Sequence, residues 1–238
     1  MRGIGTIVNV LAVLAGGGIG LILKGGMKQR YQDIMMQALG LATMFVGTVG
    51  TLQGMLMVRD GSIGSQGTLL MVLSLTIGGI TGEFLNIEQK LEQFGEWLKR
   101  KVHAEQNARF VEAFVTTSLV ICVGAMAVVG SLEDGLNGNP NTLIIKSALD
   151  FAIVIVFAST LGSGSLFSAI PIAAWEGGIT AAAVFIAPFL SDALITDLSA
   201  VGSVLIFGVG VNLLFDRGIK VGNLLPALLG PVIYHMIF

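Results

Sequence analysis

Long apolar stretches alternate with short polar connections along the whole chain. Each stretch is about 17 to 25 residues long, the length that a helix needs to cross the hydrocarbon core of a bilayer. A transmembrane barrel would instead show segments of about ten residues with alternating hydrophobicity. The pattern therefore predicts an all-α, polytopic transmembrane helix bundle of about eight spans. The stretches expected to span are 4–23, 34–57, 68–85, 110–130, 142–161, 166–190, 198–215 and 221–238.

The composition supports a membrane protein and excludes several other classes. Only 12% of the 238 residues are charged and 54% are hydrophobic, with a mean hydropathy of +0.86. Since a soluble domain carries about 25% charged residues, a water-soluble fold would lack a polar surface. The net charge of −2 argues against nucleic acid as a partner, because nucleic-acid binding calls for a basic patch. Cys122 is the sole cysteine, so no intramolecular disulfide can form.

Motifs of soluble enzymes are missing from the sequence. It contains no phosphate-binding P-loop and no Gly-x-Ser-x-Gly elbow, and its glycine-rich stretches lie inside expected spans. His103 and His235 fall on opposite sides of the predicted topology, so we do not expect them to share a metal site. The sequence therefore predicts no enzyme, no catalytic residues, no resident metal and no cofactor.

Basic residues gather on one side of the predicted membrane. With eight spans, only Arg2 and Arg59 lie in connections on the other side, and Lys146 lies inside a span. The positive-inside rule makes the basic side cytoplasmic, which places both termini outside. The basic residues expected in the cytoplasm are Lys24, Lys28, Arg30, Lys90, Lys99, Arg100, Lys101, Arg109, Arg217 and Lys220.

One segment, 86–109, departs from the apolar pattern and holds about a third of all charged residues. Its apolar residues recur at helical spacing, which predicts an amphipathic helix. The basic end, Lys99 to Lys101, suits a helix C-terminus and anionic lipid headgroups. We expect a helix on the cytoplasmic membrane surface, with a docking site for a soluble partner as the alternative.

The sequence also suggests an internal duplication. Shifting it by 110 positions aligns Thr6 with Thr116, Val10 with Val120 and Gly20 with Gly130, among other pairs, without a gap. Because each copy would hold three spans, the copies would lie upside down to each other, as in many secondary transporters. This reading divides the chain into a first repeat, a linker helix, a second repeat and a C-terminal helix pair. Their boundaries are 1–85, 86–109, 110–190 and 191–238.

Glycines four residues apart, Gly16 with Gly20 and Gly78 with Gly82, recur in two of the expected spans. This spacing lets helix backbones approach closely. We expect tight packing within the chain, and glycine-lined surfaces of this kind also suit a homodimer.

Charged residues at membrane depth are the strongest candidates for a functional site. Lys146 and Asp150 are four residues apart and therefore share a helix face. Glu176 lies near the middle of the sixth span, between Pro171 and the pair Gly177–Gly178, where we expect a weakened helix with freed backbone carbonyls. Such groups mark ion or substrate paths. The alternatives are a structural ion pair or hydrogen bond that fixes helix packing and, for Glu176, an interfacial position if the ends of the sixth span are misplaced.

Further polar residues extend the candidate site. Thr160, Ser163 and Ser168 belong to a serine-rich connection after the fifth span, either a cytoplasmic turn or a re-entrant segment that lines a cavity. Whether the sixth span crosses fully therefore stays open. Asn9 and Asn212 are isolated amides, which join helices by hydrogen bonds more often than they bind a ligand.

Several motifs carry a resemblance to a known family. They are Gly5–Asn9, Gly78–Glu83, Phe110–Asp134, Lys146–Asp150, Phe157–Gly162 and Asn223–Ala227. Together they resemble the YdfK/YqgA-like bacterial membrane proteins, a family classed as a domain of unknown function. The resemblance covers nearly the whole chain and implies a multi-pass protein of the prokaryotic plasma (inner) membrane. It implies no activity or substrate class.

These observations predict a small secondary transporter or permease that binds a small cation, or a small solute coupled to a cation. We expect spans one, two, five and six to enclose a site with Asp150, Lys146 and Glu176. The alternative is a non-transporting membrane scaffold or regulatory subunit that recruits a partner through segment 86–109. The lipid bilayer and a small ion or solute are the expected partners.

Overall fold

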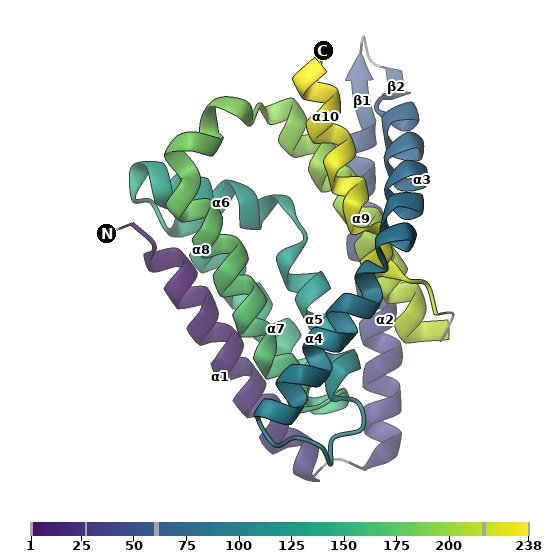
Figure 1. Cartoon of the computed structure of the whole chain (residues 1–238), viewed down its shortest axis with the longest axis vertical. Helices are drawn as coiled ribbons and strands as arrows, with labels where there is room; N and C mark the ends of the chain where they lie inside the picture. Colours follow the sequence, from purple (N-terminus) through teal and green to yellow (C-terminus); the bar gives the residue numbers. More distant parts are fainter. Residues whose placement is uncertain (1, 27, 60–61, 216–217, 238) are drawn as a thin grey trace. The chain divides into compact units, whose positions relative to one another are not determined.

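The computed structural model describes residues 2–26, 28–59, 62–215 and 218–237, and it is almost entirely helical (Figure 1). Arg217, one of the expected cytoplasmic basic residues, and Phe238 lie outside the described residues. The elements are α1 (Ile4–Gly26), α2 (Gln29–Met55), β1 (Leu56–Arg59), β2 (Ser62–Ser65), α3 (Thr68–Leu85), α4 (Ile87–Lys101), α5 (Phe110–Cys122), α6 (Ala125–Asn137), α7 (Asn141–Thr160), η1 (Ser163–Ser168), α8 (Ala169–Ile186), η2 (Ala187–Phe189), α9 (Asp192–Phe215), η3 (Val221–Leu228) and α10 (Leu229–Ile237).

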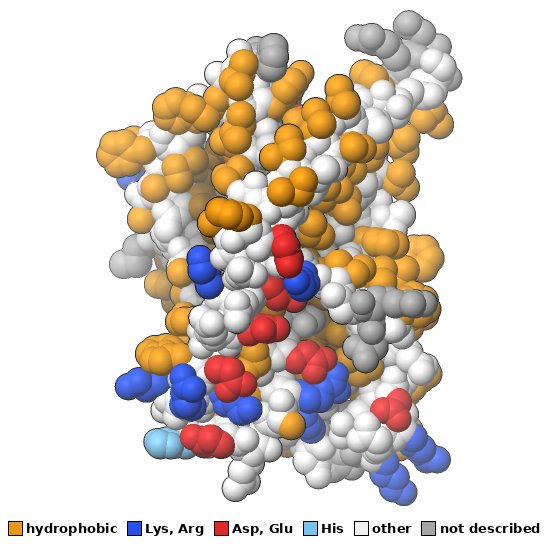
Figure 2. Space-filling model, turned by 45° about the vertical axis from the view of Figure 1, so that its right-hand side comes forward, with side chains coloured by type: hydrophobic (Ala, Val, Ile, Leu, Met, Phe, Trp, Pro, Cys, Tyr) orange, Lys and Arg blue, Asp and Glu red, His pale blue; other side chains and the backbone are white. Residues whose placement is uncertain are grey.

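The all-α polytopic class is confirmed. Within the described ranges, six helices are long and apolar enough to cross a membrane, or seven if α5 and α6 form one bent span. Large apolar side chains point outward, with Ile22, Phe84 and Phe185 about four-fifths exposed at 80%, 84% and 77%. Figure 2 shows a face on which many hydrophobic side chains are exposed. This exposure is typical of a surface that meets lipid.

The expected number of about eight spans is not confirmed, for two local reasons. The stretch 110–130 is not one helix, because α5 and α6 meet at a bend of 63°. Gly124 lies in this break with a φ of 154°, a conformation open to glycine. The last stretch divides into a 3-10 segment, η3, and the short helix α10, and Pro226 lies inside η3.

The chain divides into two compact units. Unit 1 holds residues 1–38, 91–122 and 126–189, and unit 2 holds residues 39–90, 123–125 and 190–238. The two units do not correspond to the two expected repeats, and the division does not test a duplication. The inverted repeat and its boundaries therefore stay a prediction.

In unit 1, α1 packs along α7 and also contacts α8 (Figure 1). A buried apolar cluster centred on Val13, Ile121 and Val154 joins α1, α5 and α7. The expected role of Gly16 and Gly20 is confirmed, since both face α7. A Cβ atom at Gly16 would lie 2.7 Å from the Phe151 carbonyl oxygen, and one at Gly20 would lie 2.5 Å from the Ile155 carbonyl oxygen.

In unit 2, α3 packs against η3, and Gly78 and Gly82 face the backbone of Ala227 and Asn223. The side chain of Asn223 ties these elements together: it donates to Glu83 at 2.6 Å and accepts from the Glu88 amide at 2.7 Å. The antiparallel hairpin β1–β2, with Leu56 opposite Ser65, was not expected from the sequence.

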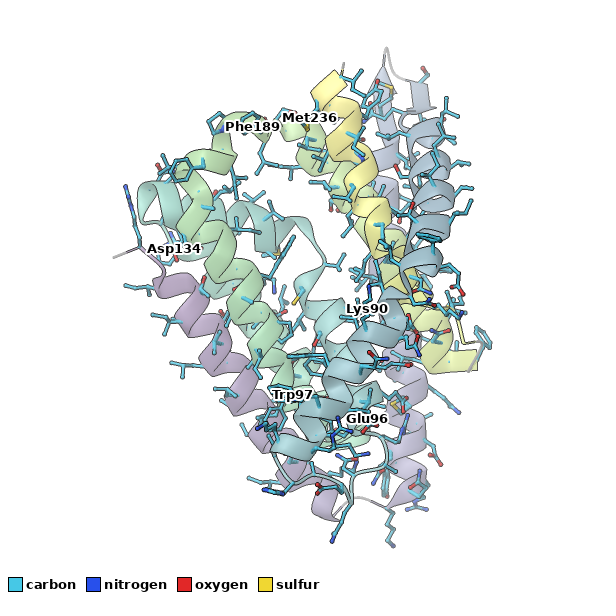
Figure 3. The ribbon with its side chains drawn as sticks, viewed as in Figure 1. Lys90, Glu96, Trp97, Asp134, Phe189 and Met236 are labelled. Carbon is cyan, nitrogen blue, oxygen red and sulfur yellow. The ribbon has the colours of Figure 1, made fainter. Side chains whose placement is uncertain are left out.

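The expected amphipathic helix is present as α4, within 87–101. Its Leu98 is buried against Phe110 and Phe114 of α5, so part of its apolar face packs on protein. Phe94 and Trp97 stay 41% and 47% exposed, and their rings stack with centroids 5.6 Å apart (Trp97 is labelled in Figure 3). Contact of α4 with a membrane surface stays a prediction.

Candidate functional site

Lys146 and Asp150 form a buried ion pair on one face of α7, as their spacing predicts. Their side chains are bonded to each other, and the two residues are only 6% and 4% exposed. Lys146 Nζ also donates to the Ile121 carbonyl oxygen at 2.8 Å. Ile121 lies in the last turn of α5, where carbonyl groups lack a partner within the helix. The bend after α5 therefore supplies an acceptor for the buried lysine.

Glu176 of α8 and Asn9 of α1 complete the group. Both residues are fully buried. Lys146 Nζ lies 3.3 Å from Glu176 Oε1. The Asn9 side-chain amide donates to Asp150 Oδ2 and to Glu176 Oε1, each at 2.9 Å. Asn9, Lys146, Asp150 and Glu176, hereafter the carboxylate cluster, thus join three helices around one amide and one ammonium group.

The expected break in the helix beside Glu176 is wrong. α8 runs without interruption from Ala169 to Ile186. Pro171 lies in its first turn, where the missing N–H group costs little, and Gly177–Gly178 stay helical. Glu176 therefore reaches the cluster from a regular helix, without freed backbone carbonyls beside it.

Two buried oxygen atoms of the carboxylate cluster are available to bind a positive charge. Among the described residues, neither Asn9 Oδ1 nor Glu176 Oε2 has a hydrogen-bond partner, although both atoms are buried. When all groups are ionised, one lysine faces two carboxylates, which leaves one excess negative charge. An uncompensated buried charge is costly, and both orphan oxygens accept rather than donate. The arrangement can therefore bind a proton or a small monovalent cation.

The other predicted site residues are held elsewhere. Thr160 donates to the Val156 carbonyl oxygen of its own helix at 2.8 Å. Ser163 accepts from Asn107 at 2.9 Å, and Ser168 donates to the Ser165 carbonyl oxygen at 2.6 Å. Asn212, in unit 2, exchanges two hydrogen bonds with the Ile219 backbone. None of these bonds reaches the cluster, and no cluster residue comes from α2, which was expected to help enclose it.

Sequence reasoning missed two polar features beside the cluster. Asp134 at the end of α6, fully buried, accepts from the Gly3 and Gly5 amides at 3.1 and 2.8 Å and caps α1 (Figure 3). Thr6 and Thr180 bring their hydroxyl oxygens to 3.5 Å between α1 and α8. Helical spacing could have revealed the threonines, because Thr6 lies three residues before Asn9 and Thr180 four after Glu176.

The chain is similar to known proteins over nearly its whole length. A family model described as "Protein of unknown function (DUF554)" matches residues 4–236. The uncharacterized membrane protein YdfK of Bacillus subtilis (strain 168) is 33% identical over 227 residues, which cover 95% of this chain and 93% of YdfK. The uncharacterized protein YqgA of Escherichia coli (strain K12) is 28% identical over 234 residues, with the same shares of 95% and 93%. No solved structure matches the chain.

Proposed function

This chain belongs to the DUF554 family, and from the carboxylate cluster we propose that it is a secondary transporter or permease for a small cation or a cation-coupled small solute. The proposal places it in the prokaryotic plasma membrane with both termini outside. The single observation that carries it is the pair of buried orphan oxygens, Asn9 Oδ1 and Glu176 Oε2, in a cluster with one excess negative charge.

A cluster of this kind suits transport better than packing alone. A structural ion pair would be neutral and its polar atoms would be satisfied, since unsatisfied buried groups destabilise a fold. Here two acceptors, one on α1 and one on α8, have no partner among the residues that the structure describes. A positive charge that binds between these helices changes how strongly they attract each other. Charge binding is thereby coupled to helix packing, which alternating access requires.

Flux measurements test the proposal. In proteoliposomes that carry an internal pH dye and receive radioactive sodium, we expect Glu176→Gln and Asp150→Asn to reduce proton or sodium flux at least tenfold. The yield of folded protein should stay close to that of the parent, because in each variant Lys146 keeps one buried carboxylate as its partner. Asp192→Asn is the matched control, because Asp192 is an exposed carboxylate in the first turn of α9 and flux should be unchanged. Parent-like flux in both cluster variants would contradict the proposal, as would a loss of flux that only follows a loss of folded protein.

The exposed aromatic pair of α4 favours one second candidate, a scaffold or regulatory subunit. Phe94 and Trp97 stack on the surface beside the basic run Lys99 to Lys101. If this surface recruits a soluble partner, replacing the three basic residues by glutamine should release that partner from a crosslinked complex while leaving flux intact. Lys28→Gln with Arg30→Gln, both exposed, should retain it. A pull-down that recovers no partner from the parent protein would contradict this candidate.

A further inference from the structure

We infer that the charge which binds the carboxylate cluster is a proton, and that it enters unit 1 from a pocket where α1 begins, across the hydroxyl groups of Thr6 and Thr180. The inference rests on the proposed function and deepens it, since it names the ion and its route.

A surface pocket of about 460 Å³ lies at this end of unit 1. Its lining includes Arg2, Gly3, Thr6, Gly135, Gly177 and Thr180. Gly177 of α8 lines the pocket beside Thr6 and leaves room there, since a Cβ atom at Gly177 would lie 3.8 Å from the Thr6 side chain. The two threonines therefore stand where the pocket meets the interior of the unit.

The threonine pair lies about one helical turn from the cluster. Side-chain bonds join α1 and α8 at Thr6 with Thr180 and, further along, at Asn9 with Glu176. Thr6 precedes Asn9 by three residues and Thr180 follows Glu176 by four, so the second bond lies about one helical turn, 5 Å, deeper than the first. Thr180 also donates to the Ser131 carbonyl oxygen at 3.2 Å, and the fully buried Ser131 hydroxyl is a third orphan polar atom in unit 1.

The geometry favours a proton over a metal ion. The threonine oxygens are 3.5 Å apart, within hydrogen-bond distance of each other, so a proton can pass by exchange, whereas a metal ion would have to break this bond. When a hydroxyl oxygen accepts a proton, it releases its own hydrogen to the next acceptor and stays neutral. The last transfer to Glu176 would need a water molecule between the threonine pair and the carboxylate, which then becomes a neutral carboxyl group. A metal ion would also have to pass the guanidinium of Arg2, which lines the pocket and is bonded to the Leu136 carbonyl oxygen.

The groups that face Glu176 suit this assignment. From α7 these are Lys146 and Asp150, from α1 the neutral Asn9, and from the end of α5 the thiol of Cys122. On α6, Asp134 is bonded to the Gly3 and Gly5 amides and Glu133 accepts from the Thr142 hydroxyl. η1 carries no charged residue. One proton on Glu176 therefore leaves Lys146 and Asp150 as a balanced pair.

Infrared difference spectroscopy tests the ion without any transport assay. After a drop in pH, the parent protein should gain a carbonyl-stretch band of a protonated carboxyl group that is missing in Glu176→Gln. A sodium jump at constant pH should leave this band unchanged. Loss of the band on addition of sodium would overturn the assignment of a proton, and so would the failure of any such band to appear. Neither result depends on flux. Failure of the proton assignment can therefore be distinguished from failure of the proposed transport function.

Two further variants test the route. The band should grow at least tenfold more slowly in Thr6→Val with Thr180→Val, which removes both hydroxyl groups at nearly constant volume, and at the parent rate in Thr180→Ser. In a Cys122→Ala background, Gly177→Cys should react with a charged methanethiosulfonate reagent. Ile179→Cys, on the buried side of α8 at 8% exposure, should not. An unchanged rate in the valine variant, or an unreactive Gly177→Cys, would overturn the route.

Discussion

Replacing Lys146 by methionine should strongly reduce the yield of folded protein. The lysine is the cation that faces both buried carboxylates of the cluster, so its loss leaves Asp150 and Glu176 joined through Asn9 without a positive charge. Removing one partner of a buried ion pair costs about 3–5 kcal/mol. The measurement is the folded yield in detergent, together with the midpoint of thermal unfolding.

A double variant should rescue the fold, and a lysine in an exposed ion pair serves as the control. Adding Asp150→Asn to Lys146→Met removes the matching negative charge and should restore most of the lost stability. Lys220→Met breaks an ion pair with Glu83 whose side chains are 57% and 55% exposed, and exposed pairs contribute only about 0–1 kcal/mol. If Lys146→Met and Lys220→Met proved equally stable, the buried cluster described for unit 1 would be wrong.

The second large effect is expected at Gly82. Its missing Cβ would collide with the backbone of Asn223, which cannot move aside without shifting η3. Overpacking of a tight contact costs about 1–3 kcal/mol, and we expect Gly82→Ala to lie at the upper end because the obstructing atoms belong to the backbone. Denaturant unfolding followed by circular dichroism would measure the change in the free energy of unfolding.

Gly79 provides the matched control on the same helix. Its Cβ would meet only the end of the Leu224 side chain, at 3.1 Å. Replacing a helical glycine by alanine also favours the helix by about 1 kcal/mol. Gly79→Ala should therefore stay close to the parent protein. A loss in Gly79→Ala as large as that in Gly82→Ala would contradict the close packing of α3 on η3.

The apolar pattern predicts the helical class because lipid exposure and span length are properties of composition. It does not predict the bend between α5 and α6, because the hydrophobic run continues unchanged across Gly124, and only the backbone conformation differs there. The hairpin β1–β2 was also missed. Its strands are four residues each, too short to give a periodic signal.

The candidate site was predictable in part. Lys146 and Asp150 are close in sequence, so their pairing follows from helical spacing. The bonds of Asn9 to Asp150 and Glu176 join residues 141 and 167 positions apart, which no local pattern specifies. Thr160 was selected for its polarity, but its hydroxyl is satisfied by the preceding turn of its own helix. Hydroxyl-rich composition therefore does not distinguish a binding site from a helix end whose hydroxyl groups donate to carbonyl oxygens of the same helix.

The stacked pair on α4 has a practical consequence for spectroscopy. The chain contains two tryptophans: Trp97, stacked on Phe94, and Trp175, which directly precedes Glu176 on α8. Trp97→Phe conserves an aromatic ring next to Phe94 and leaves Trp175 as the sole tryptophan fluorophore. Its emission then reports from the turn of α8 that carries the buried carboxylate, so changes there can be followed in unlabelled protein.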